Sequence, residues 1–281
     1  MGKTMITGLR GKVAICTGSG RKDGLGEGIL KRLASEGCRV VVSDIGTPEQ
    51  HLERDDVGVS ADMDKIASEI RAAGGDAIVV PCDVRQKDQV SALIKSTVTA
   101  FGQVDIMINN AGIGYVMKHL DALSLDEWQL VMDVNLTGSF LCTQAASRQM
   151  TLQKNGGRII NIASQAGKSG FPHMAPYVAS KHGLIGLTRA CAIDLGPKGI
   201  TVNAICPNHV TTGLGAKQNE YFANFLGLSV IDYLAAMRKR IPLGRPGKSA
   251  DTAAAVAFLA SDEAAFITGE AMNVSGGEEM H

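Results

Sequence analysis

The stretch KVAICTGSGRKDGLGEGI, residues 12–29, indicates how this chain folds. Its first part is a short apolar run with β-branched residues that stops at a glycine, which predicts a buried strand. From Gly24 through Ala34 the pattern is helical, and the basic pair Arg21 and Lys22 lies between the two elements. A strand that runs through glycines into a helix predicts an anion site, because backbone N–H groups and the helix dipole face the ligand.

Six further segments continue this alternation of strand and helix. The predicted strands lie in CRVVVSD (38–44), AIVVPCDV (77–84), VDIMINNAG (104–112), GRIINIAS (157–164), GITVNAICP (199–207) and EAMNVSGG (270–277). Continuous apolar runs indicate strands buried on both faces, and therefore a parallel sheet covered by helices. The sequence thus predicts an α/β protein: a single-domain, doubly wound (Rossmann) seven-stranded parallel sheet with helices on both faces, over residues 1–281.

Two segments lie outside this alternation. Residues 46–64 are polar and unpatterned, and we interpret them as a surface loop or as an extension that helps to retain a cofactor. Residues 213–240 follow the sixth strand, and a segment of this length outside the sheet predicts a substrate lid. The apolar residues expected to cover the substrate are Tyr221, Phe222, Phe225, Leu226 and Leu228.

Composition limits the classes of function. The formal net charge is zero, so nothing predicts bulk attraction to nucleic acid or to an anionic membrane. Six cysteines are scattered without a C-x-x-C pair, and six histidines form no H-E-x-x-H motif, so we expect neither a disulfide framework nor a metal site. No apolar run reaches the ~18 residues of a membrane span. We expect a cytoplasmic protein that binds a small molecule.

Asp44 adds a second feature to the glycine loop. The loop does not fit G-x-G-x-x-G in register, but Asp44 ends the second predicted strand, twenty positions after Gly24. An acid there can accept hydrogen bonds from ribose hydroxyls and repels a 2′-phosphate. Loop and acid together favour a dinucleotide site over a glycine turn without a ligand.

The strongest signal for chemistry lies at 158–181. Tyr177 and Lys181 are four positions apart on a predicted helix and therefore share one face. A phenol has a pKa of about 10, and a nearby ammonium lowers it, so the pair suits proton exchange with an alcohol or ketone. Ser164 ends a predicted strand thirteen residues before Tyr177, where its hydroxyl can bond the substrate oxygen. An isolated Y-x-x-x-K is more often an exposed helix pair, but the combination disfavours that interpretation.

With these motifs the chain resembles the short-chain dehydrogenase/reductase family over nearly its whole length. The family's T-G-x-x-x-G-x-G loop corresponds to Thr17, Gly18, Gly24, Leu25 and Gly26 after a two-residue expansion that makes residues 19–23 a bulge. The family's N-N-A-G corresponds to residues 109–112.

The resemblance implies a catalytic tetrad. It assigns Tyr177 as the acid and base, Ser164 as the donor to the substrate oxygen, and Lys181 as a ribose ligand that tunes the phenol. Asn135, in VMDVNLTG, is implied to anchor a proton-relay water.

The resemblance also implies a cofactor-binding set. Pro207–Asn208 replaces the family's P-G, and asparagine tolerates left-handed backbone angles, so the turn can survive with its side chain toward the nicotinamide or substrate. The complete set is Gly18, Ser19, Gly24, Leu25, Gly26, Asp44, Asp83, Val84, Asn110, Ala111, Gly112, Tyr177, Lys181, Pro207, Asn208, Val210 and Thr212.

The cofactor and assembly are expected as follows. Asp44, followed by Ile45, favours NAD, whereas Arg21 and Lys22 keep NADP open unless they face solvent or the pyrophosphate. The resemblance implies a homotetramer with residues 250–261 and the Tyr177 helix at interfaces, although internal packing explains the small residues of 250–261 equally well.

The predicted function is an NAD-dependent oxidoreductase that moves a hydride between nicotinamide and a medium-sized, partly apolar secondary alcohol or ketone. Gln165, His173 and His209 are the predicted substrate contacts, with Met174 and Asn208 beside them. Two alternatives stay open: an NADPH-dependent 3-oxoacyl thioester reductase and a non-catalytic dinucleotide sensor.

Overall fold

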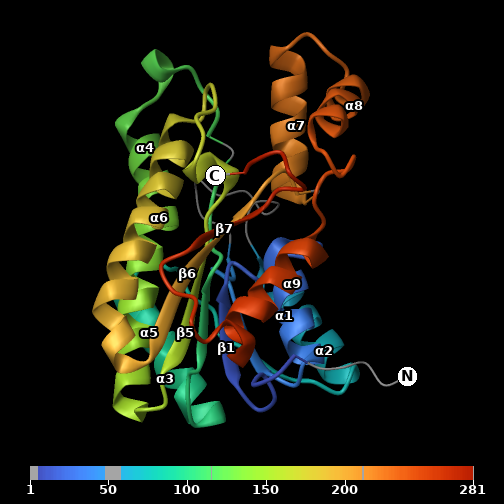
Figure 1. Ribbon diagram of the computed structural model, residues 1–281. Helices are drawn as coiled ribbons and strands as arrows, with labels where there is room; N and C mark the ends of the chain where they lie inside the picture. Colours follow the sequence, from blue (N-terminus) through green and yellow to red (C-terminus); the bar gives the residue numbers. More distant parts are fainter. Residues whose placement is uncertain (1–5, 48–57, 115, 211, 281) are drawn as a thin grey trace.

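Seven strands form one parallel sheet in the order β3-β2-β1-β4-β5-β6-β7 (Figure 1). The computed structural model describes residues 6–47, 58–114, 116–210 and 212–280. The strands are β1 (Val13–Thr17), β2 (Arg39–Ser43), β3 (Asp76–Val79), β4 (Ile106–Asn109), β5 (Gly157–Ile162), β6 (Ile200–Pro207) and β7 (Ala271–Val274). The predicted α/β class, with its seven-stranded doubly wound sheet, is confirmed.

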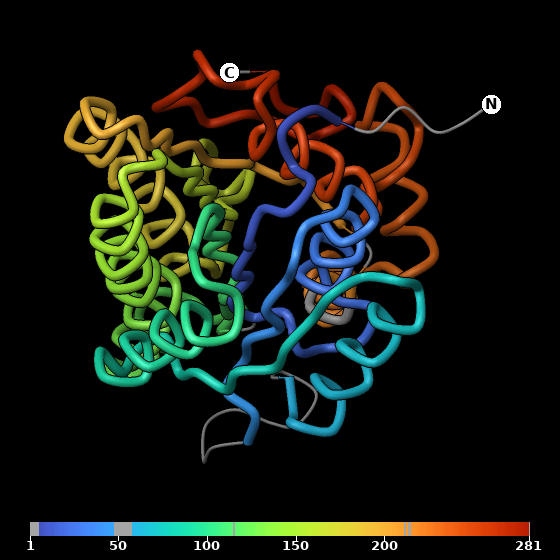
Figure 2. The backbone as a smooth tube through the Cα atoms, turned by 90° about the horizontal axis from the view of Figure 1, so that it is seen from below, coloured from blue at the N-terminus to red at the C-terminus, as the bar shows by residue number. Residues whose placement is uncertain are grey.

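Helices cover both faces of this sheet. They are α1 (Leu25–Ser35), α2 (Ser60–Ala72), α3 (Lys87–Phe101), α4 (Leu125–Met132), α5 (Gly138–Gln153), α6 (Ala175–Leu195), α7 (Gly213–Phe225), α8 (Val230–Arg240) and α9 (Ser249–Ala260). Seen from below, α1, α2 and α9 lie on one side of the strands and α3, α5 and α6 on the other (Figure 2). Each layer has its own buried core. Leu33, Ile66 and Val256 belong to one core, and Leu93 and Ala146 belong to the other.

Burial explains why continuous apolar runs become strands here. Every residue of β1 and of β6 is buried. The third strand is shorter than the predicted 77–84 and ends at Val79. Pro81 has no N–H to donate, so the regular ladder stops there, although the N–H groups of Val80 and Cys82 still bond the Val42 and Asp44 carbonyls.

The strand order creates the edge at which a ligand can bind. After β1 the chain builds β2 and β3 on one side and then returns to place β4 on the other side of β1. The segments that leave β1 and β4 therefore diverge from neighbouring carboxyl ends. Such a switch point is where open α/β sheets bind their ligands.

The two segments predicted to lie outside the strand–helix alternation differ in structure. Residues 213–240 form α7 and α8, which project beyond the carboxyl ends of the strands (Figure 1). The segment 46–64 was expected to be unpatterned throughout, but α2 begins at Ser60, and Gly46 pairs with Val59 in a parallel bridge. Residues 48–57 of that segment lie outside the described residues.

Several small residues of 250–261 pack inside the chain. Ala253 and Ala257 of α9 are buried in the same core as α1. A Cβ added to Gly28 of α1 would lie 2.9 Å from the Ser249 Cβ, so the two helices approach closely. Internal packing therefore accounts for the buried alanines, whereas Ala250 and Ala254 are exposed, and the homotetramer stays a prediction. In the described residues no helix has the length and apolarity that a membrane crossing requires.

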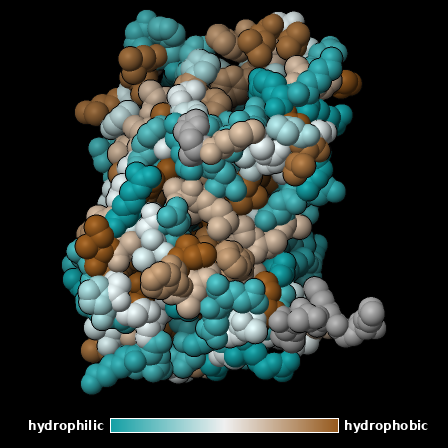
Figure 3. Space-filling view, viewed as in Figure 1, coloured by the Kyte–Doolittle hydropathy of each residue, from teal (hydrophilic) through white to brown (hydrophobic). Residues whose placement is uncertain are grey.

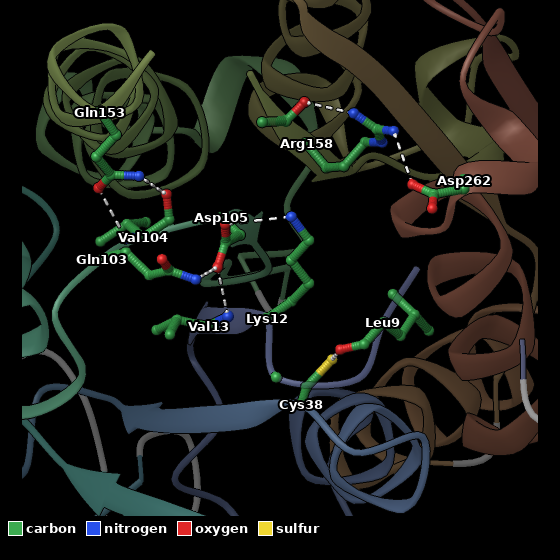
Figure 4. Close-up of polar contacts among 12 residues, drawn as sticks. Leu9, Lys12, Val13, Cys38, Gln103, Val104, Asp105, Gln153, Arg158 and Asp262 are labelled. Carbon is green, nitrogen blue, oxygen red and sulfur yellow. Dashed lines mark hydrogen bonds and ion pairs between the residues drawn. The ribbon is translucent and has the colours of Figure 1, made fainter. Parts of the chain in front are cut away.

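Asp105 ties the start of β1 to the start of β4 (Figure 4). Its buried carboxylate accepts a hydrogen bond from the Val13 N–H at 2.8 Å and one from the Gln103 side chain at 2.7 Å. Lys12 Nζ lies 3.6 Å from the other carboxylate oxygen, with its side chain 40% exposed. The buried Val13 N–H has the larger effect on stability, because a surface ion pair contributes little.

We expect Asp105→Ala to lower the free energy of unfolding by about 1–3 kcal/mol, because the buried Val13 N–H loses its acceptor. Lys12→Met is the matched control: it removes only the exposed cation and should cost less than about 1 kcal/mol. Urea denaturation measures both values. Equal effects of the two substitutions would contradict this account.

Candidate active site

A cavity of about 420 Å³ lies at the carboxyl ends of the strands. Loops that follow the strands form its walls, and α7 and α8 cover it, with hydrophobic side chains gathered over this upper end of the molecule (Figure 3). The predicted site residues that line it are Gly18, Gly24, Leu25, Asp44, Asp83, Val84, Asn110, Ala111, Gly112, Ser164, Gln165, Tyr177, Lys181, Pro207, Asn208, His209, Val210 and Thr212. The fold therefore brings together groups from seven separate segments of the sequence.

The glycine loop leaves room for a ligand because its backbone packs closely elsewhere. Gly18 has a φ of +63°, and a Cβ there would lie 2.6 Å from the Ala111 Cα. A Cβ on Gly26 would lie 2.6 Å from the Ser19 Cα and 2.8 Å from the Gly18 carbonyl oxygen. Real Cβ contacts are not this short, so side chains at these positions would displace the loop. A cradle of this kind fits the pyrophosphate of a dinucleotide.

Side chains of neighbouring strands hold the loop in place. The Asn110 amide donates to the Thr17 and Gly18 carbonyls at 2.9 and 2.8 Å. The Ser19 hydroxyl is fully buried, donates to the Cys16 carbonyl and accepts from the Ser43 N–H, so it joins β1 to β2 and lies outside the cavity lining. Ser19 was predicted to bind the cofactor, but its side chain stabilises the loop through these hydrogen bonds.

The two basic residues of the loop, Arg21 and Lys22, have different surroundings. Lys22 Nζ lies 2.9 Å from Glu27 and 2.9 Å from Glu69, and these hydrogen bonds raise its pKa. Glu27 is 5% exposed and also accepts from Lys31, so a small ion network fixes the expanded loop to α1 and α2. Arg21 instead lines the cavity.

Asp44 lies at the end of β2 beside the glycine loop, as the sequence predicted for a dinucleotide site. Its carboxylate lines the cavity just after β2 and accepts hydrogen bonds from the Gly20 N–H at 3.0 Å and the Ile45 N–H at 2.9 Å. Burial raises the pKa of Asp44, although backbone hydrogen bonds and the nearby Arg21 oppose this. Gly58 is a third backbone donor to this carboxylate, which has about four acceptor positions, so Asp44 can still accept a hydrogen bond from a ribose hydroxyl.

Tyr177, Ser164 and Lys181 meet in the wall of the cavity. Tyr177 and Lys181 lie one turn apart in α6, and Ser164 follows β5, where its oxygen also accepts from the Ala166 N–H at 3.0 Å. Ser164 and Tyr177 both line the cavity, and the Ser164 side chain opposes the rise that burial causes in the pKa of the Tyr177 phenol. The Lys181 ammonium donates to the Ile162 carbonyl at 2.7 Å and lies 5.6 Å from the centre of the Tyr177 ring.

The pKa values of this pair differ from the expectation. Burial raises the pKa of Tyr177, and the Ser164 side chain only partly opposes it. Burial also lowers the pKa of Lys181 to about 8. Desolvation disfavours the charged form of both groups and is the largest cause of both pKa shifts.

Asn135 supports the site from behind the cavity lining. It is fully buried in a π-helical turn, residues 133–137, between α4 and α5. Its amide accepts from the Ile113 N–H at 2.8 Å and donates to the Ile113 carbonyl at 2.9 Å and to the Ser180 hydroxyl at 3.0 Å. π-helical turns are frequent at functional sites. Asn135 thus fixes the loop after β4 to the helix that carries Tyr177.

Two expectations for the substrate side need correction. His173 lies outside the cavity lining, because its Nδ1 is 2.7 Å from the Tyr221 hydroxyl and its ring packs on Phe225. Asn208 does not adopt a left-handed backbone angle. Its side chain bonds Glu278 of the C-terminal segment instead.

Sequence reasoning missed part of the lining. Of the predicted lid residues, Phe222, Phe225 and Leu226 line the cavity. Met237, Arg240 and Glu278 also line it and were not predicted to contact a substrate. Arg240 and Glu278 carry no local motif, so their approach follows from the folding of α8 and the C-terminal segment. Within the described ranges no group of three His, Cys, Asp or Glu side chains is arranged to hold a metal ion.

Comparison with known proteins agrees with this geometry. A family model described as enoyl-(acyl carrier protein) reductase matches residues 18–279. The 3-oxoacyl-[acyl-carrier-protein] reductase of Synechocystis is 39% identical over 98% of this chain and 100% of its own length. The reductase FabG of Staphylococcus aureus is 37% identical over 96% of this chain and 98% of its own.

Solved structures are similar over the same range. Carveol dehydrogenase from Mycobacterium avium, in complex with NAD, has a TM-score of 0.88 at 32% identity and covers 96% of this chain and 98% of its own. An actinorhodin polyketide ketoreductase variant with NADPH has a TM-score of 0.86 at 34% identity, over 98% and 100% of the two chains.

We expect Gly26→Ala to weaken NAD binding about tenfold or more, because the new Cβ must displace the backbone of the loop. Gly186→Ala is the control, since nothing lies within 4 Å of a Cβ at that position of α6. Calorimetric titration with NAD measures both dissociation constants. A folded Gly26→Ala variant with unchanged affinity would refute the assignment of the loop.

Proposed function

We propose the function of this chain as a member of the short-chain dehydrogenase/reductase family, to which it belongs. It interconverts ketones and secondary alcohols of medium size and partly apolar character, with NAD as cofactor. Members of this family are oxidoreductases of CH–OH and C=O groups, and this chain is one of them. The observation that carries the proposal is that Ser164, Tyr177 and Lys181 line one cavity, which has an apolar lid.

The reaction requires a positioned proton donor and acceptor. The bound nicotinamide supplies the hydride chemistry. Tyr177 gives its phenolic proton to the carbonyl oxygen in reduction and takes it back in oxidation. Ser164 donates to the same oxygen and stabilises the charge that develops there. Lys181, with its pKa near 8, is mostly protonated at neutral pH, so its charge favours the transiently ionised phenol.

The remaining members of the site position these groups. Asn135 holds the backbone of Ile113 and the Ser180 hydroxyl, and thereby fixes the turn of α6 that carries Lys181. Gly18, Gly24 and Leu25 form the loop that receives the pyrophosphate.

We expect Tyr177→Phe to reduce turnover by about 10²–10⁴-fold, because only the proton-transferring hydroxyl is removed. NAD affinity should change by no more than a few fold. Tyr221→Phe removes a hydroxyl from a tyrosine outside the cavity lining and should retain most of the turnover. NADH absorbance during oxidation of a panel of secondary alcohols measures the rates. Near-normal turnover by Tyr177→Phe would reject the mechanism.

NAD is the proposed cofactor because of Asp44. A carboxylate just after β2 repels a 2′-phosphate, and Lys22 is bound by Glu27 and Glu69, which disfavours its use as a phosphate ligand. Arg21, near Asp44, is the group that could favour NADP.

We therefore expect the wild-type protein to prefer NAD over NADP by about tenfold or more in kcat/KM, and Asp44→Ala to reduce that preference. Asp44 can favour NAD by repelling a 2′-phosphate or by accepting hydrogen bonds from the ribose hydroxyls. Asp44→Asn separates these two effects, since it removes the charge but keeps an oxygen that accepts hydrogen bonds. Rates with each cofactor on one substrate give the ratios. A wild-type preference for NADP would overturn the choice of NAD.

A second candidate is an NADPH-dependent reductase of 3-oxoacyl thioesters. The names of the relatives favour it. Arg238 and Lys239 also favour it, because they are exposed on α8 beside the cavity residue Arg240 and offer a basic surface on which a carrier of opposite charge could dock. The two candidates differ in cofactor, so the comparison of NAD with NADP also discriminates between them.

Three further parts of the proposal concern the whole chain. The dinucleotide and catalytic residues belong to one domain, with residues 213–240 as its lid. The protein is a homotetramer, as the family resemblance implies. It is cytoplasmic, which the six unpaired cysteines support.

A further inference from the structure

The cavity wall holds a charged pair that the mechanism does not use. Glu278 comes from the segment after β7, and Arg240 is the last residue of α8. Both line the cavity, and Arg240 Nε lies 3.1 Å from Glu278 Oε1. The Glu278 side chain is 14% exposed and that of Arg240 is 60% exposed. The carboxylate is therefore the deeper partner, and the guanidinium reaches it from the lid.

Asn208 fixes this pair to the end of β6. Its amide donates to Glu278 Oε2 and, at 3.4 Å, to the Ser275 carbonyl. In the family pattern this position is a glycine, which has no side chain to offer. This chain therefore adds a donor that orients Glu278 on the cavity wall.

The charges of this cluster balance. Burial lowers the pKa of His209, so its ring is neutral at neutral pH, and burial raises the pKa of Tyr233, so its phenol keeps its proton. Only the opposite charges of Glu278 and Arg240 remain among these four cavity residues. A ligand that brought a further charge here would leave it uncompensated in a partly buried site, which is costly.

The cluster still has hydrogen-bonding capacity for a neutral ligand. Each Glu278 oxygen has a lone pair beyond those used by Arg240 and Asn208, and the guanidinium has N–H groups beyond Nε. His209 Nε2 is buried without a hydrogen-bond partner within the described part of the protein. Around it the wall is apolar, with Phe222, Met237 and other hydrophobic side chains.

We propose that Glu278 and Arg240 determine substrate specificity, by selecting ketones and secondary alcohols whose apolar body carries a second, neutral hydroxyl group. That hydroxyl donates to Glu278 and accepts from Arg240. The inference rests on the proposed function and names the substrate class of that same site. Asn208 is the positioning residue that holds Glu278.

The test compares four ketones that differ in one substituent. Benzylacetone carries no second polar group, and its para-hydroxy, para-carboxy and para-aminomethyl counterparts add a neutral hydroxyl, an anion and a cation. We expect the wild-type kcat/KM to be about tenfold higher for the para-hydroxy ketone than for benzylacetone, as for one hydrogen bond to a charged group. Both charged ketones should be poorer than the para-hydroxy ketone.

Substitutions should change this order in a charge-dependent way. Glu278→Gln leaves the Arg240 charge uncompensated, so the para-carboxy ketone should improve relative to the para-hydroxy one. Arg240→Met has the opposite effect and should favour the para-aminomethyl ketone. Lys239→Ala, which removes an exposed cation from the neighbouring position outside the lining, should leave the order unchanged. NAD affinity of each variant reports whether the fold is retained.

A binding measurement separates failure of this inference from failure of the proposed function. Calorimetry with the NADH-loaded Tyr177→Phe variant should show tighter binding of the para-hydroxy ketone than of benzylacetone even though turnover is lost. If the wild-type protein reduces none of the four ketones, the proposed function fails, and the binding order alone decides the inference. Equal binding of the two ketones, or an order that Glu278→Gln and Arg240→Met leave unchanged, would overturn it.

Discussion

The site depends on a close approach between two backbones at the carboxyl ends of β1 and β4. Gly18 packs so near Ala111 that a Cβ would lie 2.6 Å from the Ala111 Cα, and the Asn110 side chain bonds both carbonyls at the end of β1. This contact exists only because β1 and β4 are parallel neighbours. It places the glycine loop in the same cavity lining as Asp44, Tyr177 and Lys181.

Burial, more than local charge, sets the chemistry of the catalytic pair. Both the phenol of Tyr177 and the ammonium of Lys181 lose hydration in the cavity wall, so both are shifted toward their neutral forms. The neutral phenol is the form that gives a proton to the substrate in reduction, and the protonated Lys181 favours the phenolate that must accept one in oxidation. The hydrogen bond from Lys181 to the Ile162 carbonyl orients the ammonium beside the Tyr177 ring.

Long-range ion pairs connect the outer elements to this centre. Glu27 and Glu69 bind Lys22 and hold the expanded loop to α1 and α2. Arg240 and Glu278 join the lid to the C-terminal segment on the cavity wall. The first network removes one basic side chain from the cofactor side, while the second adds a balanced pair of charges to the lining.

Local patterns in the sequence were enough to predict the seven parallel strands, the glycine loop with Asp44, and the Ser164, Tyr177 and Lys181 set. Each of these is a local pattern: continuous apolar runs mark buried strands, and a four-residue spacing places two side chains on one helix face. Which side chains are desolvated, and which of them touch across the fold, follows from the packing of distant elements. The shifted pKa of Tyr177, the turn of His173 toward Tyr221 and the approach of Glu278 to Arg240 all depend on side chains far apart in the chain, because desolvation and long-range contact have no signature in a short stretch of sequence.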